Sequence, residues 1–174
     1  MLEKKVIVFD LDGTIAESKQ TLDEEMSGLL LLLMKNRVVA IASGGSFSQY
    51  QKQFLPFLKS DSSLSNLVLL PTSGASMYRY IDNNWVISYE EKMSMEDFEK
   101  INTALIKAMK IAGLGPVEKY GEIIEYRDTQ VTFSGLGQNA PLSQKKVWDT
   151  DQSKRKKIVA LLENELSDWN AERI

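Results

Sequence analysis

Three short apolar runs, separated by helix-like segments, restrict the fold of the first seventy residues. The runs are Val6–Phe9, Val38–Ala42 and Leu67–Leu70. They are continuous and rich in β-branched residues, which is typical of strands buried on both faces of a parallel sheet. Between them we expect helices over 21–35, where Thr21 and Glu24 form a capping box, and over 47–58. This order predicts an α/β fold, a Rossmann-like doubly wound parallel sheet with right-handed crossovers.

The pattern changes near residue 77 to one that is typical of an α+β unit. Two strands flank the turn Asp82-Asn83-Asn84 as a hairpin, and a long helix ends at Gly113. Two short strands then precede a last helix. These elements are expected over 77–81, 85–89, 94–112, 123–126, 130–134 and 151–169. The sequence therefore predicts two domains, a core over 1–76 and a second domain over 77–174.

Composition excludes several classes of chemistry. The chain has no cysteine and no histidine, which removes disulfides, thiolate or imidazole metal sites and Ser-His-Asp triads. A net charge of −3 argues against a nucleic-acid partner. The longest apolar run, Leu29–Met34, is too short to span a membrane, and no cleavable signal opens the chain. We therefore expect a soluble, cytoplasmic protein whose chemistry rests on carboxylates, hydroxyls and cations.

The strongest motif is Asp10-Leu11-Asp12-Gly13-Thr14, directly after the first apolar run. Ligands of open α/β sheets bind at the carboxyl ends of the strands, and strand periodicity directs Asp10 and Asp12 to the same side. Two carboxylates repel each other unless a cation lies between them, and their hard oxygens suit Mg²⁺. Gly13 allows a sharp turn beside a bound anion. The alternative is a turn in which both aspartates accept hydrogen bonds from loop amides.

A second motif, Ser43-Gly44-Gly45-Ser46, follows the second apolar run. A hydroxyl followed by glycines at the start of a helix presents backbone N–H groups and a positive dipole end to an anion. Such a loop is common by itself. Because the carboxyl ends of neighbouring parallel strands meet, the second motif gains weight from the aspartate motif one strand earlier.

Together the two motifs resemble those of the haloacid dehalogenase superfamily of phosphotransferases. The resemblance implies that Asp10 is the nucleophile that forms an aspartyl-phosphate, and that Asp12 is the general acid and base. It implies that Thr14, Ser43, Gly44 and Gly45 bind the phosphoryl group. It also implies that Asp10 and the backbone carbonyl of Asp12 bind Mg²⁺.

The layout of the second domain is similar to the α/β cap of phosphomannomutases and sugar phosphatases. In phosphomannomutases the corresponding stretch begins and ends with arginines that grip the sugar phosphate. Here the first position is Arg127 and the second is Gln138, an amide that cannot replace the paired hydrogen bonds of a guanidinium. The resemblance therefore implies a hydrolase acting on a small sugar phosphate, with a phosphosugar mutase as the alternative. Arg127 could instead be a solvated cation at a strand end.

Part of the family pattern has no match in this chain. The family also uses a lysine and further aspartates on core strands that follow the cap. The predicted core has three strands with Val6–Phe9 at or near an edge, which favours self-association. A truncated or non-catalytic fragment with a binding role is therefore a further alternative.

Other charged and aromatic residues are expected to be structural. We interpret Lys154–Lys157 as a solvated helix face and Trp148 as a core or domain-contact residue. Asp149 and Asp151 are interpreted as loop and helix-cap residues rather than metal ligands.

Overall fold

The computed structural model describes residues 5–17, 20–58, 62–115 and 120–167. The chain divides into two compact units, Met1–Lys92 and Met93–Ile174, and each is considered by itself. No helix within these described ranges combines the length and the hydropathy that a membrane span requires.

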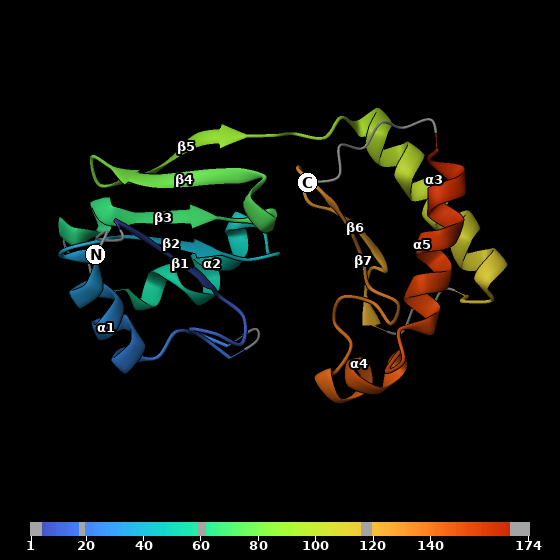
Figure 1. Cartoon of the computed structure of the whole chain (residues 1–174), viewed down its shortest axis with the longest axis horizontal. Coiled ribbons are helices and arrows are strands. Elements are labelled where there is room, and N and C mark those ends of the chain that lie inside the picture. The colour runs from blue at the N-terminus through green and yellow to red at the C-terminus, as the bar shows by residue number, and fades with distance from the viewer. Residues whose placement is uncertain (1–4, 18–19, 59–61, 116–119, 168–174) are drawn as a thin grey trace. The chain divides into compact units, whose positions relative to one another are not determined.

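The first unit contains one mixed sheet of five strands in the order β1-β2-β3-β4-β5 (Figure 1). The strands are β1 (Val6–Asp10), β2 (Val38–Ala42), β3 (Leu67–Leu70), β4 (Ser76–Ile81) and β5 (Asn84–Glu90). The first three pair in parallel, with Phe9 opposite Ile41 and Ile41 opposite Leu69, while β4 and β5 add antiparallel strands. The α/β class predicted from the sequence is confirmed.

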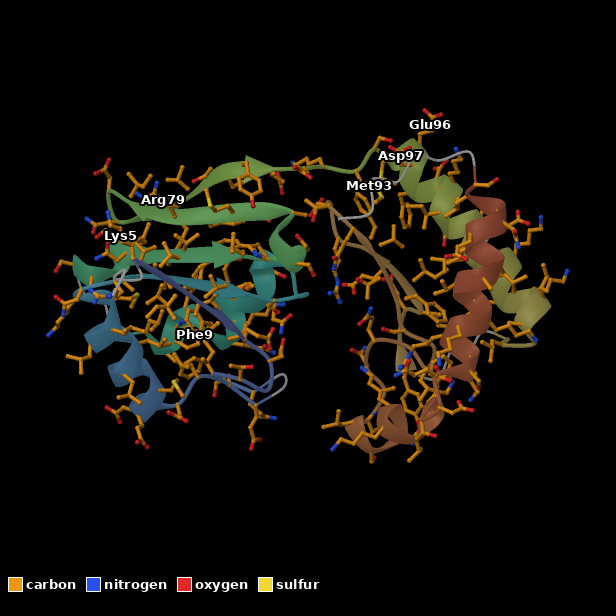
Figure 2. All side chains as sticks on the ribbon, viewed as in Figure 1. Lys5, Phe9, Arg79, Met93, Glu96 and Asp97 are labelled. Carbon is orange, nitrogen blue, oxygen red and sulfur yellow. The ribbon has the colours of Figure 1, made fainter. Side chains whose placement is uncertain are left out.

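Helices α1 (Glu24–Met34) and α2 (Phe47–Gln53) pack on one face of this sheet. Met34, Tyr50 and Phe54 are fully buried against the side chains of β2 and β3, and Phe9 packs against the same cluster (Figure 2). Asp23, not Thr21, is the N-cap of α1, because its side chain accepts a hydrogen bond from the Met26 N–H at 2.7 Å. Helix α2 ends before Pro56, and a 3₁₀ turn over Leu55–Phe57 follows it.

Strand β1 differs from the expectation that it is buried on both faces. Val6 and Val8 are 52% and 60% exposed, whereas Phe9 faces the helices. The reason is that both described helices of this unit cover the same face. Within the described ranges, β1 pairs with β2 alone and forms an edge of the sheet.

The predicted hairpin is present as β4 and β5, joined by Asp82 and Asn83, which both have positive φ (48° and 63°). Because β4 pairs with β3, the hairpin extends the sheet of the first unit. The compact units therefore divide between Lys92 and Met93, later in the chain than the expected domain boundary at residue 76.

The second unit packs helices against a two-stranded sheet. Its elements are α3 (Met95–Ala112), β6 (Ile124–Tyr126), β7 (Val131–Phe133), α4 (Leu142–Trp148) and α5 (Ser153–Glu165). Ser94 caps α3 beside the acidic Glu96 and Asp97 of its first turn, and Gly113 ends it with a φ of 73° (Figure 2). Helices α3 and α5 form a small core with Val131 and Phe133. Helix α4 was not anticipated from the sequence.

Candidate active site

The aspartate loop begins at the carboxyl end of β1. Asp10 is the last residue of the strand, and Leu11 turns into the core, where its N–H donates to the Ala42 carbonyl at 3.0 Å. Gly13 has a φ of 82°, and its N–H donates to the Ala16 carbonyl at 2.7 Å. The Thr14 hydroxyl donates to Asp10 Oδ2 at 3.3 Å. The loop thus turns back on itself and holds Thr14 beside Asp10.

The structure brings the two predicted motifs together at Asp12. Its Oδ2 accepts hydrogen bonds from the hydroxyl of Ser43, at 3.3 Å, and from Nε2 of Gln49, at 3.2 Å. Ser43 is buried, whereas Asp10 is exposed. Sequence reasoning missed Gln49, which lies in α2, the helix that follows the glycines.

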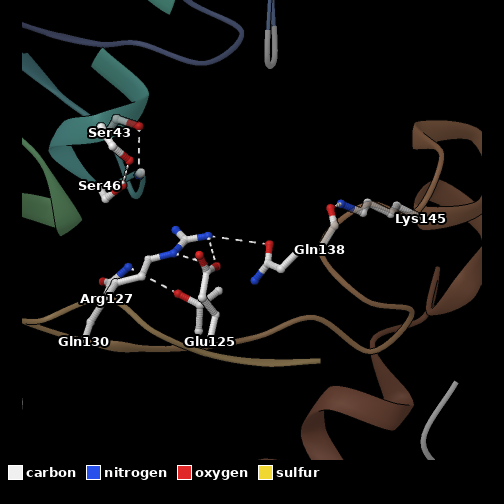
Figure 3. Close-up of polar contacts among 10 residues, drawn as sticks. Ser43, Ser46, Glu125, Arg127, Gln130, Gln138 and Lys145 are labelled. Atoms are coloured by element: carbon white, nitrogen blue, oxygen red, sulfur yellow. Dashed lines mark hydrogen bonds and ion pairs between the residues drawn. The ribbon is translucent and has the colours of Figure 1, made fainter. Parts of the chain in front are cut away.

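The loop over 43–46, the Ser43 loop, is held in its conformation by internal hydrogen bonds. The Gly45 N–H donates to Ser43 Oγ at 3.0 Å. A Cβ atom on Gly45 would lie 1.7 Å from Gln49 Oε1, so a side chain there would displace the amide that reaches Asp12. Ser46 is the N-cap residue of α2, and its hydroxyl contacts that of Ser48 (Figure 3). Gly44 is exposed beside this loop.

The loop after β3 joins the same region, and sequence reasoning missed it. Thr72 and Ser73 both have positive φ (49° and 59°), a conformation that is uncommon for residues other than glycine. The Thr72 N–H donates to the Gly45 carbonyl at 2.8 Å, and the Ser73 N–H donates to the Ser43 carbonyl at 2.9 Å. The ends of three neighbouring strands therefore meet at one edge of the sheet.

Tyr50 lies beneath this site with its ring fully buried. Its hydroxyl donates to the Ile41 carbonyl at 3.0 Å. Burial, followed by the negative charges of Asp12 and Asp10, raises the pKa of the Tyr50 phenol far above its usual value. The phenol therefore stays protonated and acts as a fixed support rather than as a base.

The oxygen atoms of the aspartate loop are of the type that binds a hard cation such as Mg²⁺. Carboxylate and carbonyl oxygens are the ligands that Mg²⁺ prefers, and Mg²⁺ takes six of them, several usually from water or a substrate phosphate. Across the described ranges, no three acidic, histidine or cysteine side chains gather into a group that could hold a metal ion. Asp10 and Asp12 would therefore supply a minority of the ligands.

Arg127 and Gln138 lie together in the second compact unit, separate from the unit that holds Asp10. Oε2 of Glu125 accepts hydrogen bonds from Nε and Nη2 of Arg127 at 2.9 and 2.7 Å. Nη2 also lies 3.5 Å from Oε1 of Gln138 (Figure 3). The Arg127 side chain is only 18% exposed. It is therefore a neutralised, largely buried cation rather than a solvated one, and Glu125 is a neighbour that the sequence did not indicate.

Comparison with known proteins gives a consistent assignment. A family model for haloacid dehalogenase-like hydrolases matches residues 7–170. The chain is 24% identical to a phosphomannomutase of Encephalitozoon cuniculi over 95% of its length, and 22% identical to that of Saccharomyces cerevisiae over 94%. It spans 64% and 63% of those relatives, which is less than two thirds of their length.

Solved structures show the same fold. IMP-bound, N-terminally truncated IMP-nucleotidase of Plasmodium falciparum superposes with a TM-score of 0.63 at 14% identity, over 98% of this chain and 48% of that one. The ATP-bound form gives a TM-score of 0.64 at 15% identity, over 95% of this chain and 41% of that one.

A pair of glycine substitutions tests the turn at Gly13. Neither Gly13 nor Gly28, inside α1, has an atom within 4 Å of a Cβ built on it, so the two differ in backbone conformation and not in space. We expect Gly13→Ala to lower the free energy of unfolding by about 1 kcal/mol, because its φ is positive. Gly28→Ala should raise it by about 0.5–1 kcal/mol, because alanine favours the helix. Urea denaturation measures both, and equal effects would contradict the left-handed turn.

Proposed function

Because this chain belongs to the haloacid dehalogenase-like hydrolases, we propose that it is a phosphohydrolase acting on a small phosphate monoester, in particular a sugar phosphate. The observation that carries the proposal is the arrangement at Asp12, whose carboxylate accepts hydrogen bonds from Ser43 and Gln49 beside the exposed Asp10. The names of the matched relatives, phosphomannomutase and IMP-nucleotidase, both refer to phosphorylated small molecules. The proposed substrate belongs to the same chemical class.

In the proposed mechanism, the Asp10 carboxylate attacks phosphorus and the bond to the leaving oxygen breaks. Asp12 donates a proton to that oxygen, and the product is an aspartyl-phosphate. The Asp12 carboxylate then takes a proton from water, whose oxygen attacks phosphorus and releases Asp10 with inorganic phosphate. Ser43, Thr14 and the backbone of Gly44 and Gly45 hold the phosphoryl oxygens.

Mg²⁺ is the proposed cofactor, held by the Asp10 carboxylate and the Asp12 backbone carbonyl. When bound, it neutralises charge on the phosphoryl group. The side chain of Gln49 orients the Asp12 carboxylate, while the Ser43 hydroxyl, which donates to the same oxygen in the structure, would donate to the phosphoryl group instead when substrate binds.

The second unit is proposed to act as a cap, with Arg127 and Gln138 contacting the substrate. Glu125 neutralises Arg127 in the structure, so a substrate anion would share or replace that ion pair. Two alternatives remain. A mutase would have to hold a second phosphate, for which the amide of Gln138 is poorly suited. A non-catalytic binding role is favoured by the small number of acidic side chains at the aspartate loop among the described residues.

We also propose that the edge strand β1 pairs with a second copy of this chain. A groove of about 460 Å³ beside the strand is lined mainly by apolar side chains, including Ile7, Leu29, Leu32 and Leu33. Leu29 and Leu32 are exposed, as are Val6 and Val8 on the strand itself. A long apolar edge strand favours pairing with another chain.

Substitutions of the two aspartates test the covalent mechanism. Asp10→Asn should lower turnover of p-nitrophenyl phosphate by on the order of a thousandfold or more, because the nucleophile is lost. Asp12→Asn should still form a phospho-enzyme but break it down slowly, because water activation needs the carboxylate. Rapid-quench trapping of phosphoprotein distinguishes the two. Substantial turnover by Asp10→Asn, or normal breakdown in Asp12→Asn, would exclude these roles.

Gln138→Arg tests the position of the cap residues. The new guanidinium should strengthen binding of a hexose bisphosphate by about tenfold, since a charge-assisted hydrogen bond to phosphate contributes about 1.5–3 kcal/mol, part of which the neighbouring Arg127 offsets. Binding of the hexose monophosphate should change less. Calorimetric titration of both ligands decides the point, and equal effects on the two would show that position 138 does not face a second phosphate.

The self-association proposal predicts dimers that a charge on β1 disrupts. Sedimentation equilibrium of the wild-type chain should give a dimer, and Val8→Lys should shift it to monomer, because a charged lysine on an edge strand disfavours pairing with another chain. Val86→Lys is the matched control, since Val86 is an exposed valine on β5 at the other edge. A monomeric wild type, or equal dissociation by both variants, would contradict pairing through β1.

A further inference from the structure

A cavity of about 180 Å³ lies in the second unit, between the turn after β7 and helices α4 and α5. Its walls include Phe133, Gly135, Leu136, Lys145, Trp148 and Arg155. The proposed hydrolysis gives no role to Trp148 or Arg155. Two cationic side chains, one from each helix, therefore border a cavity with an aromatic wall.

Close packing fixes the aromatic wall. The rings of Trp148 and Phe133 are 6.4 Å apart between centroids. A Cβ atom on Gly135 would lie 2.1 Å from the Trp148 ring, so the backbone of the turn lies directly against the indole and only glycine fits there. Trp148 is thus held in place on two sides while it borders the cavity.

A buried carboxylate orients Arg155. The Asp149 side chain is fully buried, and it accepts hydrogen bonds from the N–H groups of Lys154, at 2.9 Å, and Arg155, at 3.2 Å. Its Oδ2 also lies 3.5 Å from Nε of Arg155. The Arg155 guanidinium is 5.8 Å from the centre of the Trp148 ring, and the side chain is 54% exposed. Asp149 therefore accepts hydrogen bonds from the first turn of α5 and lies against the Arg155 guanidinium beside the indole.

Lys145 supplies the cation from α4. Its Nζ donates to the Gln138 carbonyl at 2.7 Å, which holds the ammonium near the turn (Figure 3). The stretch 142–157 contains six lysines and arginines against two aspartates, although the whole chain has a net charge of −3. The basic run was interpreted as a solvated helix face, which describes Lys156, but Lys154 and Arg155 turn back toward Trp148. Two cations of this basic stretch, Lys145 and Arg155, thus line the cavity.

We propose that this cavity binds the phosphate group of a small molecule. The Arg155 guanidinium, oriented by Asp149, and the Lys145 ammonium both line the cavity, and together they supply the positive charge and the N–H donors that a phosphate dianion requires. The cavity volume of about 180 Å³ is well above what a single water molecule needs, so there is room for a phosphate group. Binding here needs no chemistry at Asp10 and does not rest on the proposed hydrolysis.

The test follows the indole N–H resonance of Trp148 in the ¹⁵N-labelled full chain, identified by its loss in Trp148→Phe. Sodium phosphate, titrated at constant ionic strength, should shift this resonance saturably. Arg155→Gln should weaken the apparent affinity about tenfold, which corresponds to about 1.4 kcal/mol. Lys156→Gln removes the same charge from an exposed neighbour on α5 and should leave the affinity within about twofold, as expected for a screened surface charge.

Two further variants make the outcome decisive. Lys145→Gln should also lower the apparent affinity for phosphate about tenfold. This variant tests the site even if Arg155→Gln unfolds because Asp149 has lost its partner. Ser43→Ala, in the first unit, should leave the Trp148 titration unchanged. The proposal is overturned if the wild type shows no saturable shift, if Arg155→Gln and Lys156→Gln weaken it equally, or if Ser43→Ala abolishes it.

Discussion

The candidate active site depends on the parallel pairing of β1, β2 and β3. Backbone hydrogen bonds continue past the ends of these strands, from Leu11 to Ala42, from Ser43 to Leu70 and from Ser73 to Ser43. They hold three loops at one edge of the sheet, so that residues far apart in sequence reach Asp12. Because parallel strands end at the same edge of the sheet, a change in the register between β1 and β2 would move the whole Ser43 loop away from the aspartates.

The same sheet explains where apolar surface is exposed. Alternation along β1 directs Ile7 and Phe9 toward the helix-covered face and Val6 and Val8 toward the other. Parallel strands usually require cover on both faces, and the described helices of this unit supply it on one. Val6 and Val8 therefore remain exposed on a strand whose apolar sequence is typical of burial on both faces.

The strands, and the placement of the aspartate loop and the Ser43 loop at one edge of the sheet, could be predicted from the sequence because they depend on local pattern. Asp10, Asp12 and Ser43 follow apolar runs, and strand periodicity places them. Gln49, Thr72 and Glu125 could not be predicted, since each acts through a contact with a residue distant in sequence or through an unusual backbone conformation. The cap at Asp23 was missed because Thr21 and Glu24 fit a capping box equally well by spacing. The cytoplasmic location stays a prediction.

The second unit shows that the number of cations alone does not define an anion site. Arg127 is largely buried and paired with Glu125 through two of its nitrogens, so an anion that approaches it must compete with a carboxylate already in place. Arg155 has its carboxylate partner behind it, at the start of its own helix, and half of its side chain remains exposed. A buried carboxylate behind a cation can orient the cation while its outer face stays open to an anion. A carboxylate beside the cation competes with the anion, so less free energy is gained when the anion binds. Glu125 therefore neutralises Arg127 inside the fold, whereas the Arg155 side chain is oriented by Asp149 and remains 54% exposed.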